Sequence, residues 1–260
     1  MKVAGIDVGA KFVKVVIVDG GNVVAKSNKL CGFEQMESVE EAFEEALEKA
    51  GLKREDILHI TATGSGRTEV PFADDEFTEV SAAAKGAISL IPMARTVIDV
   101  GAEEGRAMHT DADGKVLDFV INERCAAGAG SFTEAMARAL EIPLEEIGQL
   151  SLKSSKSIPM NAQCAVFAES EVVTLVHEKT PKEDIARAIH DAMASRISSM
   201  ARRLSIEKDV ALVGGLAKNV GFVDSLKRDL NMDIVVPEDP EYVPALGAAL
   251  VASSRAGGGS

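Results

Sequence analysis

The sequence predicts an α/β protein made of two domains of the same architecture with a cleft between them. The first observation is a repeat, because Ile6-Asp7-Val8-Gly9-Ala10 recurs as Ile98-Asp99-Val100-Gly101-Ala102. The second is the order of patterns, since each copy ends a β-branched run and is followed by further strand-like runs and then by segments of helical period. The third is size: 260 residues, 46% of them apolar, suffice for two smaller cores or one large core.

The first half predicts strands before helices. A β-branched strand at 3–8 is followed by a second strand, a tight turn at 19–22 and a third apolar run. An acidic amphipathic helix at 36–51 ends on a glycine. The remaining expected elements are a strand at 57–61 and a helix of small residues at 80–91, closed by Pro92.

The second half repeats this opening and then adds helices. Strands are expected at 96–100 and, after a second run and a glycine turn at 113–115, at 116–121. The elements expected after them are helices at 132–140, 165–177 and 182–204, a strand at 210–213, a helix at 220–230, a strand at 234–236 and a helix at 243–253.

These elements predict a first domain over residues 1–94 and a second over residues 95–253. The final helix, 243–253, is assigned to the second domain, and the alternative is that it packs against the first domain. Residues 254–260 end in Gly-Gly-Gly-Ser and read as a flexible tail.

Composition excludes several classes of function. The chain has 28 Lys+Arg against 41 Asp+Glu, a formal net charge of −13, which argues against sequence-independent nucleic-acid binding and against attachment to anionic lipid. The chain has no apolar run long enough to span a membrane and begins in a strand-like segment, so we expect a cytoplasmic protein. Three cysteines favour reduced thiols or metal ligands over a disulfide framework.

Asp7 and Asp99 are the candidate catalytic residues of the two repeats. A carboxylate at the carboxyl end of a strand, followed by glycine, can hold hydrated Mg²⁺ while the N–H groups of the turn approach a phosphate. In a single copy, Asp-x-Gly would be ordinary turn chemistry. The residues expected to contact a bound nucleotide are Gly9, Ala10, Lys11, Lys14, Gly101, Ala102, Gly214, Gly215, Leu216 and Asn219.

The order of these parts resembles the actin, sugar kinase and Hsp70 class of ATPases. Residues 125–132 read Cys-Ala-Ala-Gly-Ala-Gly-Ser-Phe and residues 164–172 read Cys-Ala-Val-Phe-Ala-Glu-Ser-Glu-Val. These two motifs resemble the cysteine motifs of the ATPase family of 2-hydroxyacyl-CoA dehydratase activators and ATP-dependent benzoyl-CoA reductase subunits. The resemblance extends over essentially the whole chain and implies ATP or ADP with Mg²⁺ as the nucleotide.

The family resemblance also implies one [4Fe–4S] cluster shared between two subunits, with Cys125 and Cys164 as its ligands. Each cysteine precedes an expected helix start, where the helix dipole favours the thiolate. Two cysteines per chain make half of a four-thiolate site, which a true or pseudo twofold axis would complete. Buried core cysteines and a four-thiolate zinc site remain as alternatives. Cys31 lies outside both motifs and reads as an ordinary thiol.

Two departures from the family pattern bear on the chemistry. Ala10 stands where relatives commonly have Ser, and Ala102-Glu103 stands where they commonly have Gly-Gln. Glu103 is therefore the candidate for positioning the attacking water. The stretch 101–107 looks closer to one ATPase subunit of benzoyl-CoA reductase than to the homodimeric activators, so the partner subunit is either a second copy or a paralogous chain.

We therefore expect an ATP-hydrolysing iron–sulfur protein that delivers a low-potential electron to an acyl-CoA reductase or dehydratase component. Reduced ferredoxin or flavodoxin is the implied electron donor. The alternatives are a small-molecule kinase on the same fold without a cluster, and a nucleotide-dependent binding module without redox chemistry. The roles of Glu169, Glu171 and the segment 63–67 do not follow from the sequence, and the four histidines show no ligand spacing.

Overall fold

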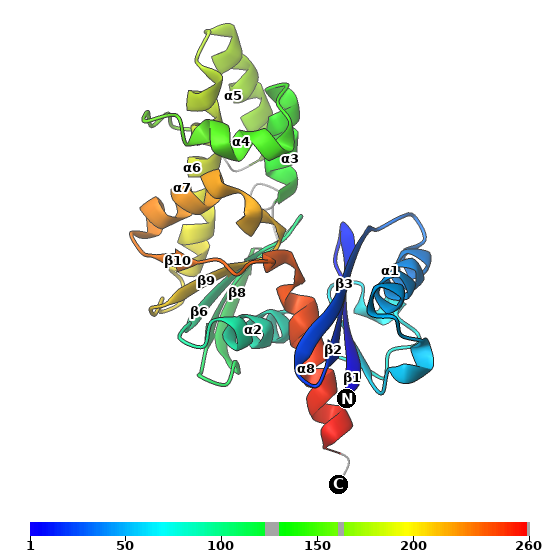
Figure 1. Ribbon diagram of the computed structural model, residues 1–260. Coiled ribbons are helices and arrows are strands. Elements are labelled where there is room, and N and C mark those ends of the chain that lie inside the picture. Colours follow the sequence, from blue (N-terminus) through cyan, green and yellow to red (C-terminus); the bar gives the residue numbers. More distant parts are fainter. Residues whose placement is uncertain (123–129, 161–163, 259–260) are drawn as a thin grey trace. The chain divides into compact units, whose positions relative to one another are not determined.

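The computed structural model describes residues 1–122, 130–160 and 164–258. These residues form two compact units. The first contains Met1–Ala94, Thr110–Leu117 and Glu241–Ser260, and the second contains Arg95–His109 and Asp118–Pro240. Each unit has a five-stranded sheet flanked by helices (Figure 1).

The sheet of the first unit has the strand order β3-β2-β1-β4-β5. The hairpin partners β1–β2 and β2–β3 are antiparallel, whereas β1–β4 and β4–β5 are parallel. The strands are β1 (Lys2–Val8), β2 (Phe12–Asp19), β3 (Asn22–Leu30), β4 (Ile60–Thr63) and β5 (Asp75–Glu76).

Helices cover both faces of this sheet because the side chains of β1 and β2 alternate between two apolar clusters. On one face, α1 (Gln35–Ala50) packs Val39 and Phe43 against Ile6. On the other face, α8 (Val243–Gly257) packs small residues such as Ala245 against Val3. Helix α2 (Glu79–Leu90) packs on α8.

Glycine makes the close approach of α8 possible. A Cβ added at Gly5 of β1 would collide with the backbone of Ala245 and Ala249, and one added at Gly247 would collide with Ala82 of α2. The small-residue composition of both helices thus serves backbone-to-backbone packing.

The sheet of the second unit has the order β10-β9-β6-β7-β8. Its β6–β7 pair is antiparallel and its β6–β9 and β9–β10 pairs are parallel, which repeats the arrangement of the first sheet and confirms the predicted fold class. The strands are β6 (Thr96–Val100), β7 (Gly105–Thr110), β8 (Val116–Asn122), β9 (Val210–Val213) and β10 (Ile234–Val235).

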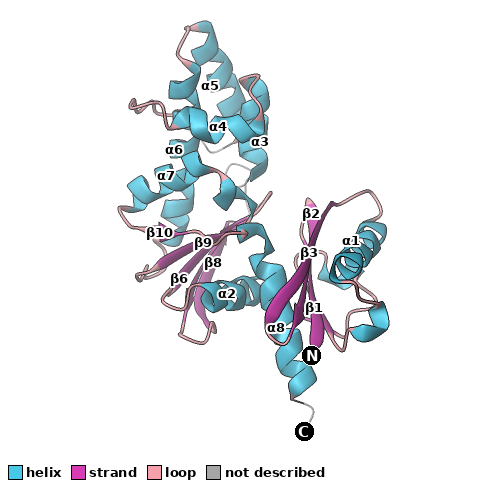
Figure 2. Ribbon diagram, in the orientation of Figure 1, coloured by secondary structure: helices cyan, strands magenta, loops and turns pink. Residues whose placement is uncertain are grey.

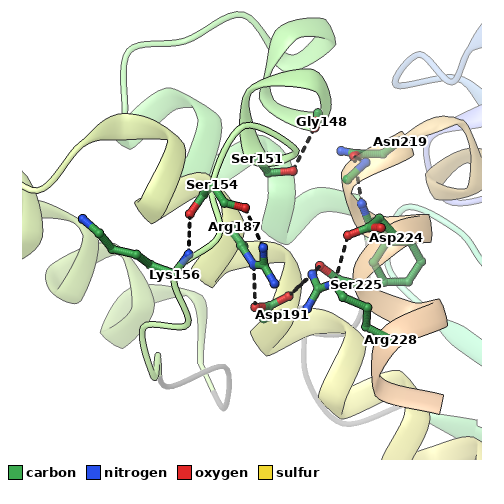
Figure 3. A network of polar contacts seen from close by, with 12 residues as sticks. Gly148, Ser151, Ser154, Lys156, Arg187, Asp191, Asn219, Asp224, Ser225 and Arg228 are labelled. Atoms are coloured by element: carbon green, nitrogen blue, oxygen red, sulfur yellow. Dashed lines mark hydrogen bonds and ion pairs between the residues drawn. The ribbon is translucent and has the colours of Figure 1, made fainter. Parts of the chain in front are cut away.

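The core of the second unit contains apolar residues of β6, β9 and its helices. These helices are α3 (Gly130–Ala139), α4 (Leu144–Ser151), α5 (Ala165–His177), α6 (Lys182–Ala201) and α7 (Val220–Leu230). In Figure 2, α6 and α7 lie next to the sheet, and α3, α4 and α5 lie farther from it. Polar contacts join three of these segments (Figure 3). Asp191 of α6 accepts hydrogen bonds from Ser225 and Arg228 of α7, and Arg187 donates to the carbonyl of Ser154 after α4.

The structure corrects three expectations about elements. The strand predicted at 57–61 lies at Ile60–Thr63, because its ladder with β1 pairs Ala4 with Ile60 and continues to Asp7 and Thr63. Helix α4 was not predicted, since its eight residues are too short for a clear helical period. The segment 254–260, expected as a flexible tail, is helical as far as Gly257 because α8 continues through it and Arg255 pairs with Asp75. Helix ends elsewhere shift by a few residues, as is usual for fraying termini. Among the described helices, none combines the length and apolar character needed to cross a membrane.

Candidate functional site

The first repeat places Asp7 at the carboxyl end of β1, with only 6% of its surface exposed. The following turn is closed by a hydrogen bond of 3.0 Å from the Gly9 N–H to the Phe12 carbonyl. Across the β1–β2 ladder, Asp7 lies opposite Lys14, whose Nζ donates to Asp7 Oδ2 at 3.0 Å. The hairpin register therefore sets a buried carboxylate beside an ammonium group.

The second repeat builds the same arrangement at Asp99, which is 3% exposed. The turn is closed by the Gly101 N–H and the Glu104 carbonyl at 2.9 Å. Arg106 lies opposite Asp99 in the β6–β7 ladder and donates from Nη1 to Asp99 Oδ2 at 3.1 Å and from Nη2 to Glu104 Oε2 at 2.7 Å. Sequence reasoning missed Arg106, although it follows Asp99 at the same spacing at which Lys14 follows Asp7.

A glycine completes each arrangement from the neighbouring parallel strand. Gly64 follows β4 and Gly214 follows β9, with φ values of +94° and +88°. A Cβ at Gly64 would lie 2.6 Å from Asp7 Oδ1, and one at Gly214 would lie 2.5 Å from Asp99 Oδ1. Both positions therefore require glycine for space as well as for conformation. Each unit presents a carboxylate, a cation and a glycine backbone at the carboxyl edge of its sheet, where ligands of parallel sheets bind.

The two glycines of the Gly214-Gly215 turn have different surroundings. The Gly214 N–H donates to the Pro240 carbonyl at 2.8 Å, whereas a Cβ at Gly215 would meet no atom of the described part of the chain within 4 Å. Leu216 is 7% exposed and belongs to the core. Asn219 caps α7, since its Oδ1 accepts from the N–H groups of Gly221 and Phe222. Gly215 is thus the residue of this turn whose backbone faces open space.

The remaining residues predicted to contact nucleotide lie on the two turns. Ala10 is exposed and Lys11 is half-buried, with its Nζ 5.7 Å from the centre of the Phe12 ring. Ala102 is half-buried, and Glu103 is exposed. The structure brings Asp7 together with Lys14 and the first turn, and it brings Asp99 together with Arg106 and the second turn.

Helix α3 is hydrogen-bonded to the second turn. The Gly130 N–H donates to the Gly101 carbonyl and the Ser131 N–H donates to the Ala102 carbonyl, both at 2.8 Å. These are amide groups of the first turn of α3, which otherwise lack partners within a helix. Helix α3, which begins within the first cysteine motif, is therefore joined directly to a candidate phosphate turn.

Two of the three cysteines lie in the described part of the chain. Cys125 lies outside the described residues. Cys164 is the N-cap residue of α5 and is half-buried. Cys31 lies at the first turn, where its thiol donates to the Gly9 carbonyl at 3.3 Å and burial raises its pKa.

Helix α5 presents apolar side chains to solvent. Val166 and Phe167 are 68% and 63% exposed, and Val173 and Val176 are also exposed. Within the described ranges, no group of three His, Cys, Asp or Glu side chains is arranged to hold a metal ion. Two cysteines from each of two chains would not form such a group within one chain.

Other candidates from the sequence take part in local contacts. Arg67 donates to the Gly64 carbonyl and pairs with Glu76, so it secures the turn after β4. His59 pairs with Asp75, His109 pairs with Glu207, and His190 is fully buried in α6. Glu169 is exposed on α5, and Glu171 is half-buried there.

Comparison with known proteins gives matches over nearly the whole chain. The model of the BadF/BadG/BcrA/BcrD ATPase family matches residues 4–252. The activator of lactoyl-CoA dehydratase from Anaerotignum propionicum is 40% identical over 98% of this chain and 99% of its own length. One of the subunits of benzoyl-CoA reductase from Thauera aromatica is 35% identical over 97% of this chain and 93% of its own length. The sequence of this chain is thus only slightly more similar to the dehydratase activator than to the benzoyl-CoA reductase subunit.

Two solved structures are closely similar. The (R)-2-hydroxyglutaryl-CoA dehydratase component A of Acidaminococcus fermentans superposes with a TM-score of 0.95 at 37% identity, covering 99% of both chains. The activator of the 2-hydroxyisocaproyl-CoA dehydratase from Clostridium difficile, with bound ADPNP, superposes with a TM-score of 0.94 at 36% identity, covering 99% of this chain and 96% of that chain.

Proposed function

The chain belongs to the BadF/BadG/BcrA/BcrD ATPase family, and from this premise we propose that it hydrolyses MgATP and thereby drives a low-potential electron to an acyl-CoA-transforming partner. The partner is a 2-hydroxyacyl-CoA dehydratase or a benzoyl-CoA reductase component, the classes to which its relatives belong by name. Reduced ferredoxin or flavodoxin is the proposed electron donor.

The observation that carries the proposal is the duplicated group of carboxylate, cation and glycine. Asp7 and Asp99 are the proposed catalytic carboxylates, which would act on the hydrated Mg²⁺ of the nucleotide. Gly64 and Gly214 fit this role, since a Cβ at either position would clash with the neighbouring aspartate carboxylate. Gly215 would support the nucleoside, because its backbone faces open space. Glu103, exposed on the second turn, is the proposed residue that positions water.

The proposed cofactor is one [4Fe–4S] cluster held by Cys125 and Cys164 of each of two subunits. Such a cluster supplies one-electron transfer at low potential. Cys164 suits a ligand role because it is half-buried at the start of a helix of 13 residues. The exposed apolar side chains of α5 support association next to the cysteine, with either a second copy or a paralogous chain.

We propose that the hydrogen bonds between α3 and the second turn couple ATP hydrolysis to the cluster. A change of the turn on ATP hydrolysis would be passed through the Gly101 and Ala102 carbonyls to α3, which begins within the motif of Cys125. The proposed functional domains follow the division at residues 94 and 95, with α8 belonging to the first.

Anaerobic purification with iron and acid-labile sulfide analysis tests the proposal. We expect a brown protein with about four iron and four sulfide per dimer, together with Mg²⁺-dependent ATPase activity. Asp7→Asn and Asp99→Asn should each lower the ATPase rate by at least tenfold without loss of fold. Asp19→Asn is the matched control, because Asp19 is also a strand-end carboxylate but is partly exposed and pairs with the N-terminal ammonium.

Each failure has a distinct meaning. ATPase activity without iron, together with phosphorylation of a small molecule, would favour the kinase alternative. Full activity of either aspartate variant would remove that residue from the site.

A further inference from the structure

A threonine stands beside Asp7 in the sheet. In the parallel ladder between β1 and β4, Asp7 is the register partner of Thr63, the last residue of β4. Partners in register present their side chains on the same face of a sheet. Lys14, Asp7 and Thr63 therefore form a row across three adjacent strands at the carboxyl edge.

The hydroxyl of Thr63 is buried and unsatisfied. Thr63 is 0% exposed, and its Oγ1 has no hydrogen-bond partner among the described residues. Buried hydroxyl groups in native proteins almost always have a partner, which is protein, water or ligand. Thr63 Oγ1, at the end of the strand beside Asp7, thus lacks among the described residues the partner that a buried hydroxyl normally has.

The fold itself does not require a hydroxyl at this place. In the second unit, the register partner of Asp99 is Val213, which is buried at 0% exposure in the equivalent position. Valine and threonine have nearly the same shape. The two halves of the repeat therefore differ at this position by one polar atom, and the half that has it is the one in which Asp7 is bound by lysine.

We propose that Thr63 is a binding residue of the nucleotide site, whose Oγ1 hydrogen-bonds to the hydrated magnesium–phosphate group that Asp7 holds. The inference rests on the proposed function and adds a residue to it. Since Lys14 binds Asp7 Oδ2, the hydroxyl provides a second polar contact at this edge from the opposite neighbouring strand. The glycine after Thr63 lets the backbone turn away directly below the carboxylate.

Thr61 provides a matched control on the same strand and the same face. It lies opposite Gly5, one row below Asp7, and beside Asp75 of β5. Burial raises the pKa of Asp75, but the contacts of this carboxylate with Arg255 and His59 outweigh burial and hold the pKa below its usual range. The Oγ1 of Thr61 is also buried without a hydrogen-bond partner among the described residues, but it lies beside Asp75, away from the proposed site.

The test measures binding of MgADPNP by calorimetry on the anaerobically purified full chain, together with the Mg²⁺ concentration that half-saturates binding. Thr63→Val should weaken MgADPNP affinity about tenfold and raise the half-saturating Mg²⁺ concentration, with an unchanged melting temperature. Thr63→Ser should restore affinity to within about twofold. Thr61→Val should leave both binding values unchanged.

Unchanged affinity and Mg²⁺ dependence in Thr63→Val would overturn the inference. If Thr63→Val does not fold, Thr63→Ala is measured in its place. Alanine lacks both the hydroxyl and the γ-methyl group of threonine. Absence of MgADPNP binding by the wild-type chain would instead contradict the proposed function. Wild-type binding that is lost in Asp7→Asn but kept in Thr63→Val would contradict only the role of Thr63.

Discussion

Asp7 and Asp99 occupy equivalent positions but have chemically different cations. Lys14 is a compact charge on a flexible stem, whereas the planar fork of Arg106 contacts two carboxylates at once. One of these, Glu104, belongs to the second turn, so Arg106 ties that turn to Asp99. The first turn is held instead by Cys31, whose N–H and thiol donate to the carbonyls of Lys11 and Gly9.

At the residue scale, Gly215 is the most direct probe of nucleoside binding. Gly215→Val should leave the melting temperature unchanged, because no atom of the described residues lies within 4 Å of its Cβ position. It should weaken ATP affinity at least tenfold by crowding the ligand, as measured by calorimetry.

Gly214→Ala is the contrasting variant for this prediction. Its Cβ would press on Asp99 Oδ1 at 2.5 Å, so it should lower both stability and affinity. Unchanged ATP affinity in Gly215→Val would place the nucleoside elsewhere.

His190 makes stability depend on pH. Burial lowers its pKa from 6.5 to about 4, and neither ring nitrogen has a partner among the described residues. The folded state therefore holds a neutral ring, and the unfolded state binds more protons below pH 6.5. The stability that the neutral ring allows is complete above pH 6.5 and is lost as the pH falls toward 4.

We expect the free energy of unfolding to fall by about 2 kcal/mol between pH 7 and pH 5 through this group alone. Urea unfolding should show this part of the drop removed in His190→Leu. It should remain in His177→Gln, which changes an exposed histidine of α5. Equal pH dependence of the wild type and His190→Leu would show that His190 does not titrate in this way.

At the scale of elements, the packing of α8 against β1 and α2 depends on glycines at the points of closest contact. Gly5→Ala should destabilise the first unit by about 3 kcal/mol, because the new Cβ would collide with the backbone of α8. Gly32→Ala is the control, since its Cβ would make an ordinary contact of 3.4 Å with Ser38. Thermal unfolding measures both, and a Gly5→Ala variant as stable as the control would show that α8 can move outward at little cost.

At the scale of the whole molecule, the prediction concerns the cysteines and the association of two chains. Cys125→Ser and Cys164→Ser should each remove the iron, since either change deletes two ligands of a site shared across a homodimer axis. Across an axis with a paralogous chain, either change deletes one. A homodimer should also dissociate more readily, because the proposed cluster would bridge the two chains. Iron analysis and light scattering, both anaerobic, measure these effects.

Cys31→Ser is the matched control, because serine keeps a donor for the Gly9 carbonyl. It should retain iron and dimer. Full iron in Cys125→Ser or Cys164→Ser, or loss only in Cys31→Ser, would remove the proposed cluster ligands.

The sequence by itself determined the two-sheet architecture and the two strand-end aspartates. The repeated pentapeptide and the alternation of apolar residues are local signals, and hydrophobic period reveals which face of an element is buried. The helices Ala165–His177 and Val220–Leu230 could be bounded in this way to the residue. The short α4 could not, because eight residues span little more than two turns.

The tertiary structure alone decided which residues meet the two aspartates. Gly64 and Thr63 reach Asp7 through the parallel β1–β4 register, and Gly214 reaches Asp99 through the β6–β9 register. Such pairings join strands far apart in the chain, and the pattern within one strand does not specify the row in which it pairs with another. Packing of both strands against their helices fixes that row, and the neighbours of each carboxylate follow from it.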